Sequence, residues 1–256
     1  MTLPPHPGLA EGPVYLDYNA TTPVDPRVAE AMAPHLTHFF GNPSSSHPYG
    51  SELRSALAAA RAQVAALIGG RPEELVYTGS GSEADLLALR GAVLAAGRPH
   101  PHVITQATEH PAVLETCRAL QRLHGARITI LPVDRVGLVK PADLAEALTD
   151  DTVLVSVMAA NNETGALQPV AELADLAHAR GALFHCDAAQ AAGKVPSTSR
   201  PWAWTSSPSS AAAVAGPVDH AGRDRDGGHT ARRRNTVNRP SGTSPGRRPF
   251  TPPVPP

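Results

Sequence analysis

The chain has 256 residues, of which 41% are hydrophobic and 18% are charged, and its formal net charge is -1. This length and composition allow one sizeable packed domain, while the near-neutral charge argues against a nucleic-acid-binding protein. Two cysteines exclude a disulfide framework and indicate a reducing compartment. The chain has no apolar run long enough for a membrane span, and Met1–Pro13 lacks the features of a signal sequence. We therefore expect a cytoplasmic protein without a membrane or nucleic-acid partner.

Two helices are predicted before the first strand. Asp25-Pro26 supplies an N-cap acid and a proline at the first helical position, so a helix is expected from Arg27 to about Phe40. Ser51–Ile68 carries a one-sided apolar stripe and stops at Gly69-Gly70, which is the pattern of an amphipathic helix. Residues 1–12 are expected to be a flexible N-terminus.

Short apolar runs then alternate with helical stretches, which predicts an α/β fold with a mainly parallel sheet and right-handed crossovers. The predicted strands are Leu75–Thr78, Val103–Thr105, Ile128–Leu131, Val153–Met158 and Leu183–Cys186, and the helices between them are roughly Ser82–Ala96, Ala112–His124, Ala142–Leu148 and Val170–Arg180. In such sheets ligands bind at the carboxyl ends of the strands, so the residues that follow each strand are the functional candidates.

The composition changes at Pro196. Every Leu, Ile and Met of the chain lies before this residue, and Ser197–Pro256 contains nine Arg and three Asp. A segment without aliphatic side chains cannot offset its ordering entropy by burial, so residues 197–256 are expected to be a disordered Pro/Arg/Ser-rich tail. With ordinary GC-rich codons, Pro196–Ser207 read one frame over becomes an apolar strand-like segment. We interpret the tail as out of frame, and a natural tail whose Arg232–Arg234 run contacts anions is the alternative.

The first predicted strand is followed by Thr78-Gly79-Ser80-Gly81-Ser82-Glu83 at the start of a helix. Small residues let backbone N–H groups approach an anion, and the helix dipole favours negative charge, so this turn predicts a phosphate site. An ordinary tight turn is one alternative. The pattern Gly79-x-Gly81-x-x-Ala84, with Glu109 as a later acid, also fits the dinucleotide fingerprint and leaves open an NAD-dependent α/β enzyme.

Polar residues follow three further strands. His110 comes after the second strand and could stack on a planar ligand or transfer protons. Asn161-Asn162 comes after the fourth, where an amide suits a phenolic or carbonyl oxygen. Asp187 ends the fifth, and a desolvated acid there either caps a helix or needs a cationic partner such as a protonated ring nitrogen. Together with a phosphate-binding turn, these residues suggest pyridoxal phosphate, a cofactor that acts as an electron sink.

The motifs now resemble those of a known family. They are Val14-Tyr15-Leu16-Asp17-Tyr18-Asn19-Ala20-Thr21-Thr22-Pro23, Gly41-Asn42-Pro43-Ser44-Ser45-Ser46-His47-x-x-Gly50, the phosphate turn, Glu109-His110, Asn161-Asn162-Glu163-x-Gly165 and Asp187-x-x-Gln190. Over about residues 13–196 they resemble the cysteine desulfurases of the class V aminotransferase group. The resemblance implies the large domain of the pyridoxal-phosphate transferase fold type I, a mainly parallel sheet sandwiched by helices, here incomplete.

The resemblance also implies an activity and a set of residue roles. Such enzymes take sulfur from L-cysteine, leave L-alanine, pass an enzyme-bound persulfide sulfur to iron–sulfur scaffold or sulfur-carrier proteins, and are homodimers. The phosphate would be bound at Gly81 and Ser82, and the ring would be stacked by His110, which also assists proton transfer. The remaining ring contacts would be made by Asn162 and Gln190 at the ring oxygen and by Asp187 at the pyridine nitrogen.

Two catalytic groups of that family are missing. The Schiff-base lysine would fall near Ala213, and neither Lys140 nor Lys194, the two lysines of the chain, is expected to replace it. The sulfur-accepting cysteine has no counterpart, because Cys117 and Cys186 are expected to be apolar fillers. We therefore expect a cysteine desulfurase-like chain that is inactive as written. A catalytically dead remnant that binds the cofactor or a partner is the alternative.

Two further expectations concern structure. Without the family's small domain and its last large-domain strands, the sheet is expected to end in an unpaired edge, which is a route to aggregation. His35, His38 and His47 could in principle hold a metal ion, but no cysteine or carboxylate completes the set, so no metal site is predicted.

Overall fold

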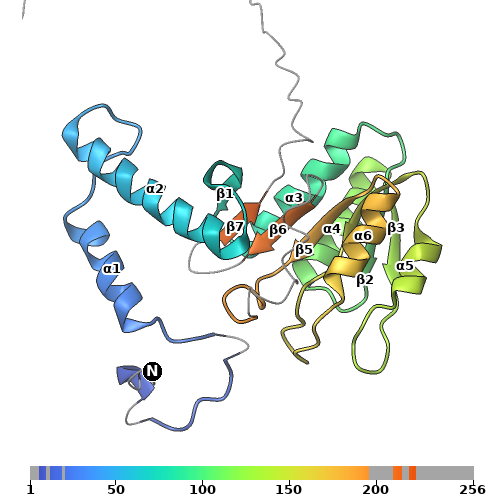
Figure 1. The fold of residues 1–256 in the computed structure, drawn as a ribbon, viewed down its shortest axis with the longest axis horizontal. Coiled ribbons are helices and arrows are strands. Elements are labelled where there is room, and N and C mark those ends of the chain that lie inside the picture. Colours follow the sequence, from blue (N-terminus) through green and yellow to red (C-terminus); the bar gives the residue numbers. More distant parts are fainter. Residues whose placement is uncertain (1–5, 10–11, 19–20, 196–209, 215–218, 223–256) are drawn as a thin grey trace, which may run out of the picture.

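The computed structural model describes residues 6–9, 12–18, 21–195, 210–214 and 219–222. At its centre is a seven-stranded sheet with the order β1-β7-β6-β5-β4-β2-β3 (Figure 1). The strands are β1 (Leu75–Thr78), β2 (His102–Gln106), β3 (Arg127–Leu131), β4 (Thr152–Ser156), β5 (Leu183–Asp187), β6 (Ser210–Val214) and β7 (Asp219–Gly222). Only β7 is antiparallel to its neighbours, so β1 runs in the same direction as the other five strands.

The helices are η1 (Pro7–Leu9), α1 (Pro26–Thr37), α2 (Pro48–Ile68), η2 (Pro72–Glu74), α3 (Gly81–Ala96), α4 (Pro111–His124), α5 (Pro141–Ala147) and α6 (Val170–Ala179). Every predicted helix and strand before Pro196 is confirmed, with ends displaced by no more than three residues. Proline at the first position starts α1, α2, α4 and α5, and a left-handed glycine ends α2, α3 and α4. Local capping chemistry therefore determined these boundaries.

Helices cover both faces of the sheet. Leu89 of α3 and Leu120 of α4 pack with Val103 and Leu154 in one apolar cluster. Leu144 of α5 and Leu173 of α6 pack in a second cluster, which includes Phe184. Strands covered on both faces are expected to be apolar throughout, and β2 and β4 are buried over their full lengths.

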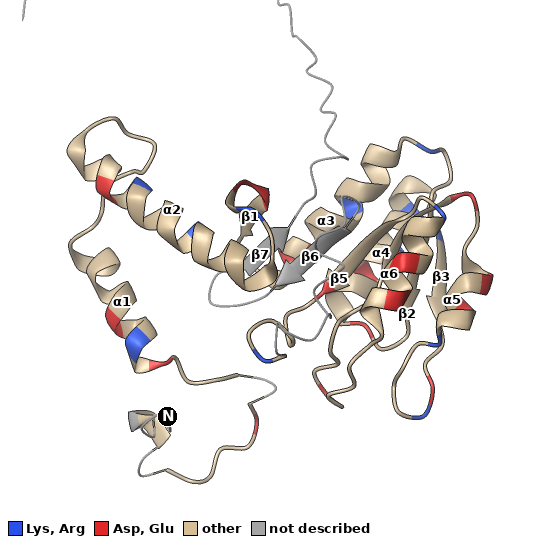
Figure 2. Ribbon diagram, in the orientation of Figure 1, with Lys and Arg blue, Asp and Glu red and all other residues tan. Residues whose placement is uncertain are grey.

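The N-terminal helices differ from this layered part. Figure 1 shows α1 and α2 extending away from the sheet, and only the last turn of α2, with Ala65 and Ile68, joins the core. We call Pro26–Ile68 the arm and Leu75–Val195 the body. Acidic and basic side chains are interspersed on both parts (Figure 2). Within the described part of the chain, no helix is long and apolar enough to cross a membrane.

The expectation for residues 197–256 is wrong at two places. Ser210–Val214 forms β6, which pairs in parallel with β5, and Asp219–Gly222 forms β7, which bridges β6 and β1. β5 is therefore paired on both sides, and the outer strands of the described sheet are β1 and β3. The physical reason is that a strand ladder is made by main-chain N–H and C=O groups and does not need aliphatic side chains. Residues 196–209, 215–218 and 223–256, including Arg232–Arg234, lie outside the described residues.

Part of the predicted flexible N-terminus is described by the structure. Pro7–Leu9 forms the short helix η1, and the His6 Nε2 atom lies 3.0 Å from the Val24 carbonyl oxygen. This contact ties the start of the described chain to the segment before α1. Residues 1–5 and 10–11 lie outside the described residues.

Candidate functional site

The loops that follow β2, β4 and β5 meet at the carboxyl edge of the sheet. They enclose a cavity of about 280 Å³ whose lining residues are His110, Met158, Ala160, Asn162, Asp187, Ala189 and Gln190. Four of the six predicted cofactor-binding residues are thus brought together. The physical reason is the parallel sheet, which carries the end of each strand to the same edge.

His110 lies at the N-terminus of α4 and is exposed. Its Nδ1 atom accepts a hydrogen bond of 3.1 Å from the Ala112 N–H and so caps the helix. Because Nδ1 is an acceptor, the neutral ring carries its proton on Nε2. The capping bond orients the ring while leaving Nε2 able to exchange a proton with a ligand.

Asp187 supplies the acidic group of the cavity. Its Oδ1 atom accepts a hydrogen bond of 2.9 Å from the Ala189 N–H. Burial and, secondly, the negative charge of Asp85 raise the pKa of the Asp187 carboxyl above its ordinary value, although the nearby His185 and His110 act in the opposite direction. Among the described residues no lysine or arginine forms an ion pair with Asp187. The Asp187 carboxyl is therefore not neutralised by a lysine or arginine of the described chain.

Two amide side chains complete the polar lining. The Asn162 Nδ2 atom donates to Glu163 Oε1 at 3.0 Å, and the Lys194 Nζ atom donates to Gln190 Oε1 at 2.6 Å. A lysine ammonium can only donate, so the Gln190 amide must turn its oxygen to Lys194 and its NH2 group away from it. Lys194, which is not expected to replace the Schiff-base lysine, is therefore hydrogen-bonded to a residue that lines the cavity.

Gly81 and Ser82 do not line this cavity. They begin α3, which follows β1, and β1 is separated from β5 by β7 and β6. The helix itself crosses toward β5, because Asp85, about one turn after Gly81, lies 3.5 Å from His185 on β5. The turn is closed by its own side chains, because Glu83 Oε2 accepts from the Gly79 N–H at 2.7 Å and Ser80 Oγ accepts from the Glu83 N–H at 3.2 Å.

A buried polar network lies beneath the cavity and was missed by sequence reasoning. His185 on β5 is fully buried; its Nδ1 atom lies 2.9 Å from Ser156 Oγ and its Nε2 atom lies 3.5 Å from Asp85 Oδ1. Ser, His and Asp are also the components of hydrolytic triads, but burial of all three residues keeps any substrate away. Two signals could have revealed the network. Asp85 shares a helical face with Ala88 and Leu89, and His185 shares a strand face with Asp187.

Glu109 was considered only as the acid of a dinucleotide site. The structure buries this side chain and directs its Oε1 atom to the Met158 N–H, at 2.6 Å. Burial and, secondly, the negative charge of Asp187 raise the pKa of the Glu109 carboxyl well above its usual range. A carboxyl group engaged in this way is not available to a ribose, which argues against the nicotinamide alternative.

The thiol groups are placed as expected. Cys117 in α4 and Cys186 in β5 are both buried. Burial raises the pKa of the Cys117 thiol to about 12, and it raises the pKa of Cys186 well above its ordinary value. Neither side chain is suited to accept sulfur, because the reactive form of a cysteine is an accessible thiolate.

The register of the sheet locates the position of the missing lysine. Ala213 on β6 is the Cα partner of Asp187 on β5. The resemblance places the Schiff-base lysine near Ala213, so the stretch in which it would fall lies beside the acid of the cavity, and β6 contains no lysine. Lys140, at the start of α5, does not line the cavity.

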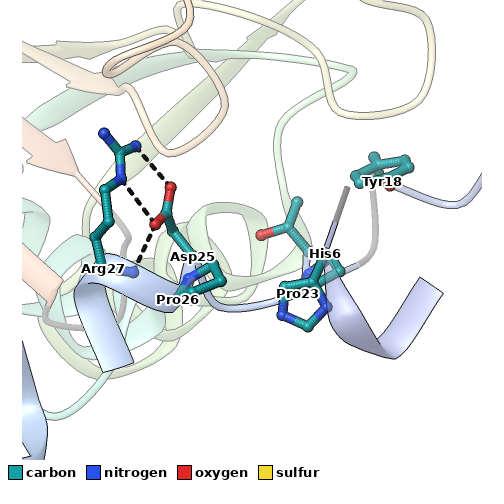
Figure 3. A pocket seen from close by; sticks show the side chains of 7 residues that line it. His6, Tyr18, Pro23, Asp25, Pro26 and Arg27 are labelled. Atoms are coloured by element: carbon teal, nitrogen blue, oxygen red, sulfur yellow. Dashed lines mark hydrogen bonds and ion pairs between the residues drawn. The ribbon is translucent and has the colours of Figure 1, made fainter. Parts of the chain in front are cut away.

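A second cavity, of about 270 Å³, lies between the N-terminal segment and the start of α1 (Figure 3). Its charged groups pair with each other, since Arg27 donates from Nε to Asp25 Oδ1 at 3.0 Å and from Nη2 to Asp25 Oδ2 at 2.7 Å. These hydrogen bonds lower the pKa of the Asp25 carboxyl to about 2. Because Asp25 and Arg27 neutralise each other, neither side chain is free to form an ion pair with a charged ligand.

The three arm histidines do not form a metal site. His35 stacks near Phe39, the ring of His38 lies 2.7 Å from Thr37 Oγ1, and His47 contacts Tyr49. Over the residues for which coordinates are described, no group of three His, Cys, Asp or Glu side chains could hold a metal ion.

Comparisons with known proteins agree with the geometry. The profile of the family Aminotransferase class-V matches residues 14–201. The mitochondrial cysteine desulfurase of Drosophila melanogaster is 50% identical over 185 residues, which are 72% of this chain and 40% of that protein. The cysteine desulfurase IscS of Dictyoglomus turgidum is 47% identical over 183 residues, or 72% of this chain and 46% of that protein.

Solved structures show the same fold. A NifS-like protein superposes with a TM-score of 0.75 at 34% identity, covering 82% of this chain and 58% of the other. A structure described as SspA in complex with cysteine also has a TM-score of 0.75, at 30% identity, covering 82% of this chain and 60% of the other. The chain spans less than half the length of the two curated relatives it matches.

Proposed function

Because the chain belongs to the class V aminotransferase family, we propose that its cavity is the pyridoxal-phosphate site of a cysteine desulfurase. The observation that carries this proposal is the convergence of His110, Asn162, Asp187 and Gln190 on one cavity. In the complete reaction L-cysteine would be converted to L-alanine, and the sulfur would pass as a persulfide to iron–sulfur scaffold or sulfur-carrier proteins. A homodimer and a cytoplasmic location belong to the same proposal.

The residues of the cavity fit the cofactor. A volume of about 280 Å³ is close to the lower end of the usual range for small-molecule sites. Asp187 has a raised pKa and no basic partner among the described side chains, so a protonated pyridine nitrogen would supply the charge it lacks. The NH2 group of Gln190, turned away from Lys194, and the amide of Asn162 are suited to an anionic ring oxygen.

Each group then has a role that its contacts support. Asp187 would hold a positive ring nitrogen, and His110, fixed by Ala112, would cover the ring and move a proton through Nε2. Gly81 and Ser82 lie outside the lining of the cavity, and the resemblance would have the first N–H groups of α3 bind the phosphate beside it. When bound, the cofactor supplies an electron sink for a carbanion formed at the amino-acid substrate.

The same arrangement would leave turnover incomplete. Asp187 has Ala213 as its register partner where the family carries its lysine, and both cysteines are buried. We therefore expect the chain to bind the cofactor without a covalent bond and to release no alanine from L-cysteine. The alternative is a remnant that uses the same cavity only for binding. The two proposals differ in one outcome: introducing the missing lysine and an accessible cysteine would restore desulfurase activity only under the first.

The experiment is a titration of the purified chain with pyridoxal phosphate, followed by absorbance and by quenching of tryptophan fluorescence. We expect saturable binding, weakened about tenfold or more in Asp187→Asn, because a hydrogen bond to a charged group is lost. Asp175→Asn, an exposed acid on α6, is the matched control and should bind like the wild type. Absence of binding by the wild type, or equal binding by Asp187→Asn, would overturn the proposal.

A further inference from the structure

Two walls of the cavity come from loops that are distant in sequence. One wall is the segment Thr108–His110 after β2, and the other is Met158–Asn162 after β4. β2 and β4 are hydrogen-bonded neighbours, but their described register ends at Ile104 and Val155. Beyond that point the backbone ladder no longer holds the two loops together. Beyond it, the described hydrogen bonds that connect the two loops directly are made by side chains.

Glu109 provides the first connection. It lies next to His110 in sequence, but its side chain is buried and reaches across to the Met158 N–H through Oε1. The other carboxyl oxygen, Oε2, is buried, and the Gln106 amide lies near the carboxyl group. Burial and, secondly, the negative charge of Asp187 raise the pKa of this carboxyl group well above its usual range, which disfavours its charged form. Its direct contribution to the loops is the hydrogen bond to the Met158 N–H.

Asn161 provides the second connection, in the opposite direction. Its Nδ2 atom donates to the Thr108 carbonyl oxygen at 3.1 Å. Its Oδ1 atom accepts from the N–H groups of Glu163 at 3.0 Å and Thr164 at 2.9 Å, which shapes the turn after β4. One buried amide thus folds its own loop and also holds the neighbouring loop. Its neighbour Asn162, by contrast, lines the cavity.

We propose that Glu109 and Asn161 are positioning residues that clamp the two loops together and thereby set the spacing between His110 and Asn162 across the cavity. This inference depends on the proposed function only for the choice of ligand, because the two connections are present in the ligand-free protein. Glu109 connects the loop of His110 to Met158 on the other wall. Asn161 connects the loop of Asn162 to Thr108 on the first wall. Neither side chain needs to touch the ligand.

The first test is amide hydrogen exchange on the full, ligand-free chain. We expect Glu109→Ala to accelerate exchange at Met158 by about tenfold or more, because that N–H loses its acceptor. Asn161→Asp keeps the Oδ1 acceptor that shapes its own turn but removes the donor to Thr108. It should also accelerate exchange at Met158, where Asn161 contacts the sulfur through Nδ2 at 3.5 Å but makes no hydrogen bond to the N–H. Unchanged exchange at Met158 in Asn161→Asp would overturn the clamp.

The second test separates hydrogen bonding from charge. Glu109→Gln keeps an acceptor for the Met158 N–H without a charge, so its exchange and its affinity for pyridoxal phosphate should match the wild type. Glu109→Ala should lower that affinity about tenfold. Glu115→Ala, an exposed acid on α4, is the matched control for loss of a glutamate. If Glu109→Gln behaves like Glu109→Ala in exchange, the carboxylate charge is required and the proposal is wrong.

A third measurement keeps the two proposals distinguishable. The imidazole signals of His110 in nuclear magnetic resonance spectra of the ligand-free chain report its environment directly. They should shift in Glu109→Ala and Asn161→Asp and stay in place in Glu109→Gln and Glu115→Ala. If the wild type binds no pyridoxal phosphate, the proposed function fails while exchange and His110 signals still decide the clamp. If the cofactor binds and the His110 signals do not move, the clamp fails alone.

Discussion

The body and the arm both carry segments that resemble the same family, yet they use them differently. In the body, the residues after β2, β4 and β5 converge on one cavity. In the arm, α1 has no buried residue, and Leu36 and Phe40 are 80% and 79% exposed. The motif that begins at Gly41 folds onto itself, with Arg54 donating to the Pro43 carbonyl oxygen at 2.8 Å.

The difference shows that a sequence motif contributes to a site only where the fold places it beside other functional residues. The body motifs follow strands, and pairing in a parallel sheet carries each strand end to a common edge. The arm motifs lie on helices and loops with no sheet beneath them. Their apolar side chains, such as Met32 and Leu36, remain on the surface of this chain. Four experiments test this difference between the body and the arm.

The largest expected effect is on the core of the body. Phe184 is fully buried between the sheet and its helices, so Phe184→Ala should lower the free energy of unfolding by about 3–5 kcal/mol. The arm counterpart, Leu36→Ala, should change it by less than about 0.5 kcal/mol. Denaturant unfolding measures both. Equal losses would mean that the arm is packed against the body in solution.

The next effect concerns the arm itself. Gly50 is buried at the start of α2, and a Cβ atom there would meet the carbonyl oxygens of Asn42 and Ser45 at 2.5 Å. Gly50→Ala should therefore loosen the loop by about 1–3 kcal/mol, because backbone atoms must shift. Faster amide exchange over residues 42–50, with unchanged unfolding of the body, is the expected result. Glu52→Ala on the exposed side of α2 is the control, and a loss of body stability in Gly50→Ala would contradict the separation.

A smaller effect depends on pH. His102 is buried between Thr152 and Thr129, and burial, with a smaller effect of Arg127, lowers its pKa from 6.5 to about 4. The unfolded chain therefore binds a proton at higher pH than the folded chain, so stability falls as the pH decreases from 7 toward 4. The loss due to His102 should be about 1 kcal/mol between pH 7 and pH 5.5.

Two substitutions isolate that contribution. His102→Gln should flatten the fall in stability over this pH range, whereas His38→Gln, at the exposed end of α1, should leave it unchanged. Urea unfolding at a series of pH values measures the slope. A wild-type slope retained in His102→Gln would show that another group is responsible.

The smallest effect is at the rim of the cavity. Lys194→Met removes the cation that orients the Gln190 amide, and the affinity for pyridoxal phosphate should fall about threefold, as for loss of an exposed polar pair. Arg54→Met removes a cation of the arm and should leave the affinity unchanged. Fluorescence titration of both variants makes the comparison. A loss in Arg54→Met would place the arm near the cavity in solution.

Much of the body could be predicted from the sequence, because its signals are local. Alternating apolar runs indicated the five strands of Leu75–Asp187, and the position of His110, Asn162 and Asp187 after strands indicated a common edge. Proline at the starts of helices and glycine at their ends marked the helix boundaries within a few residues. These features depend on periods of two or 3.6 residues and on capping chemistry, which any short window of sequence contains.

The remaining features depend on contacts between segments that are distant in the sequence. Pairing of Ser210–Val214 with β5 depends on main-chain hydrogen bonds that leave no side-chain pattern, so composition alone pointed to disorder. The burial of Glu109, the division of labour between Asn161 and Asn162, and the exclusion of Ser82 from the cavity each depend on which strand lies beside which. Strand order is set by contacts between distant parts of the chain, and these are formed only when the whole sheet assembles.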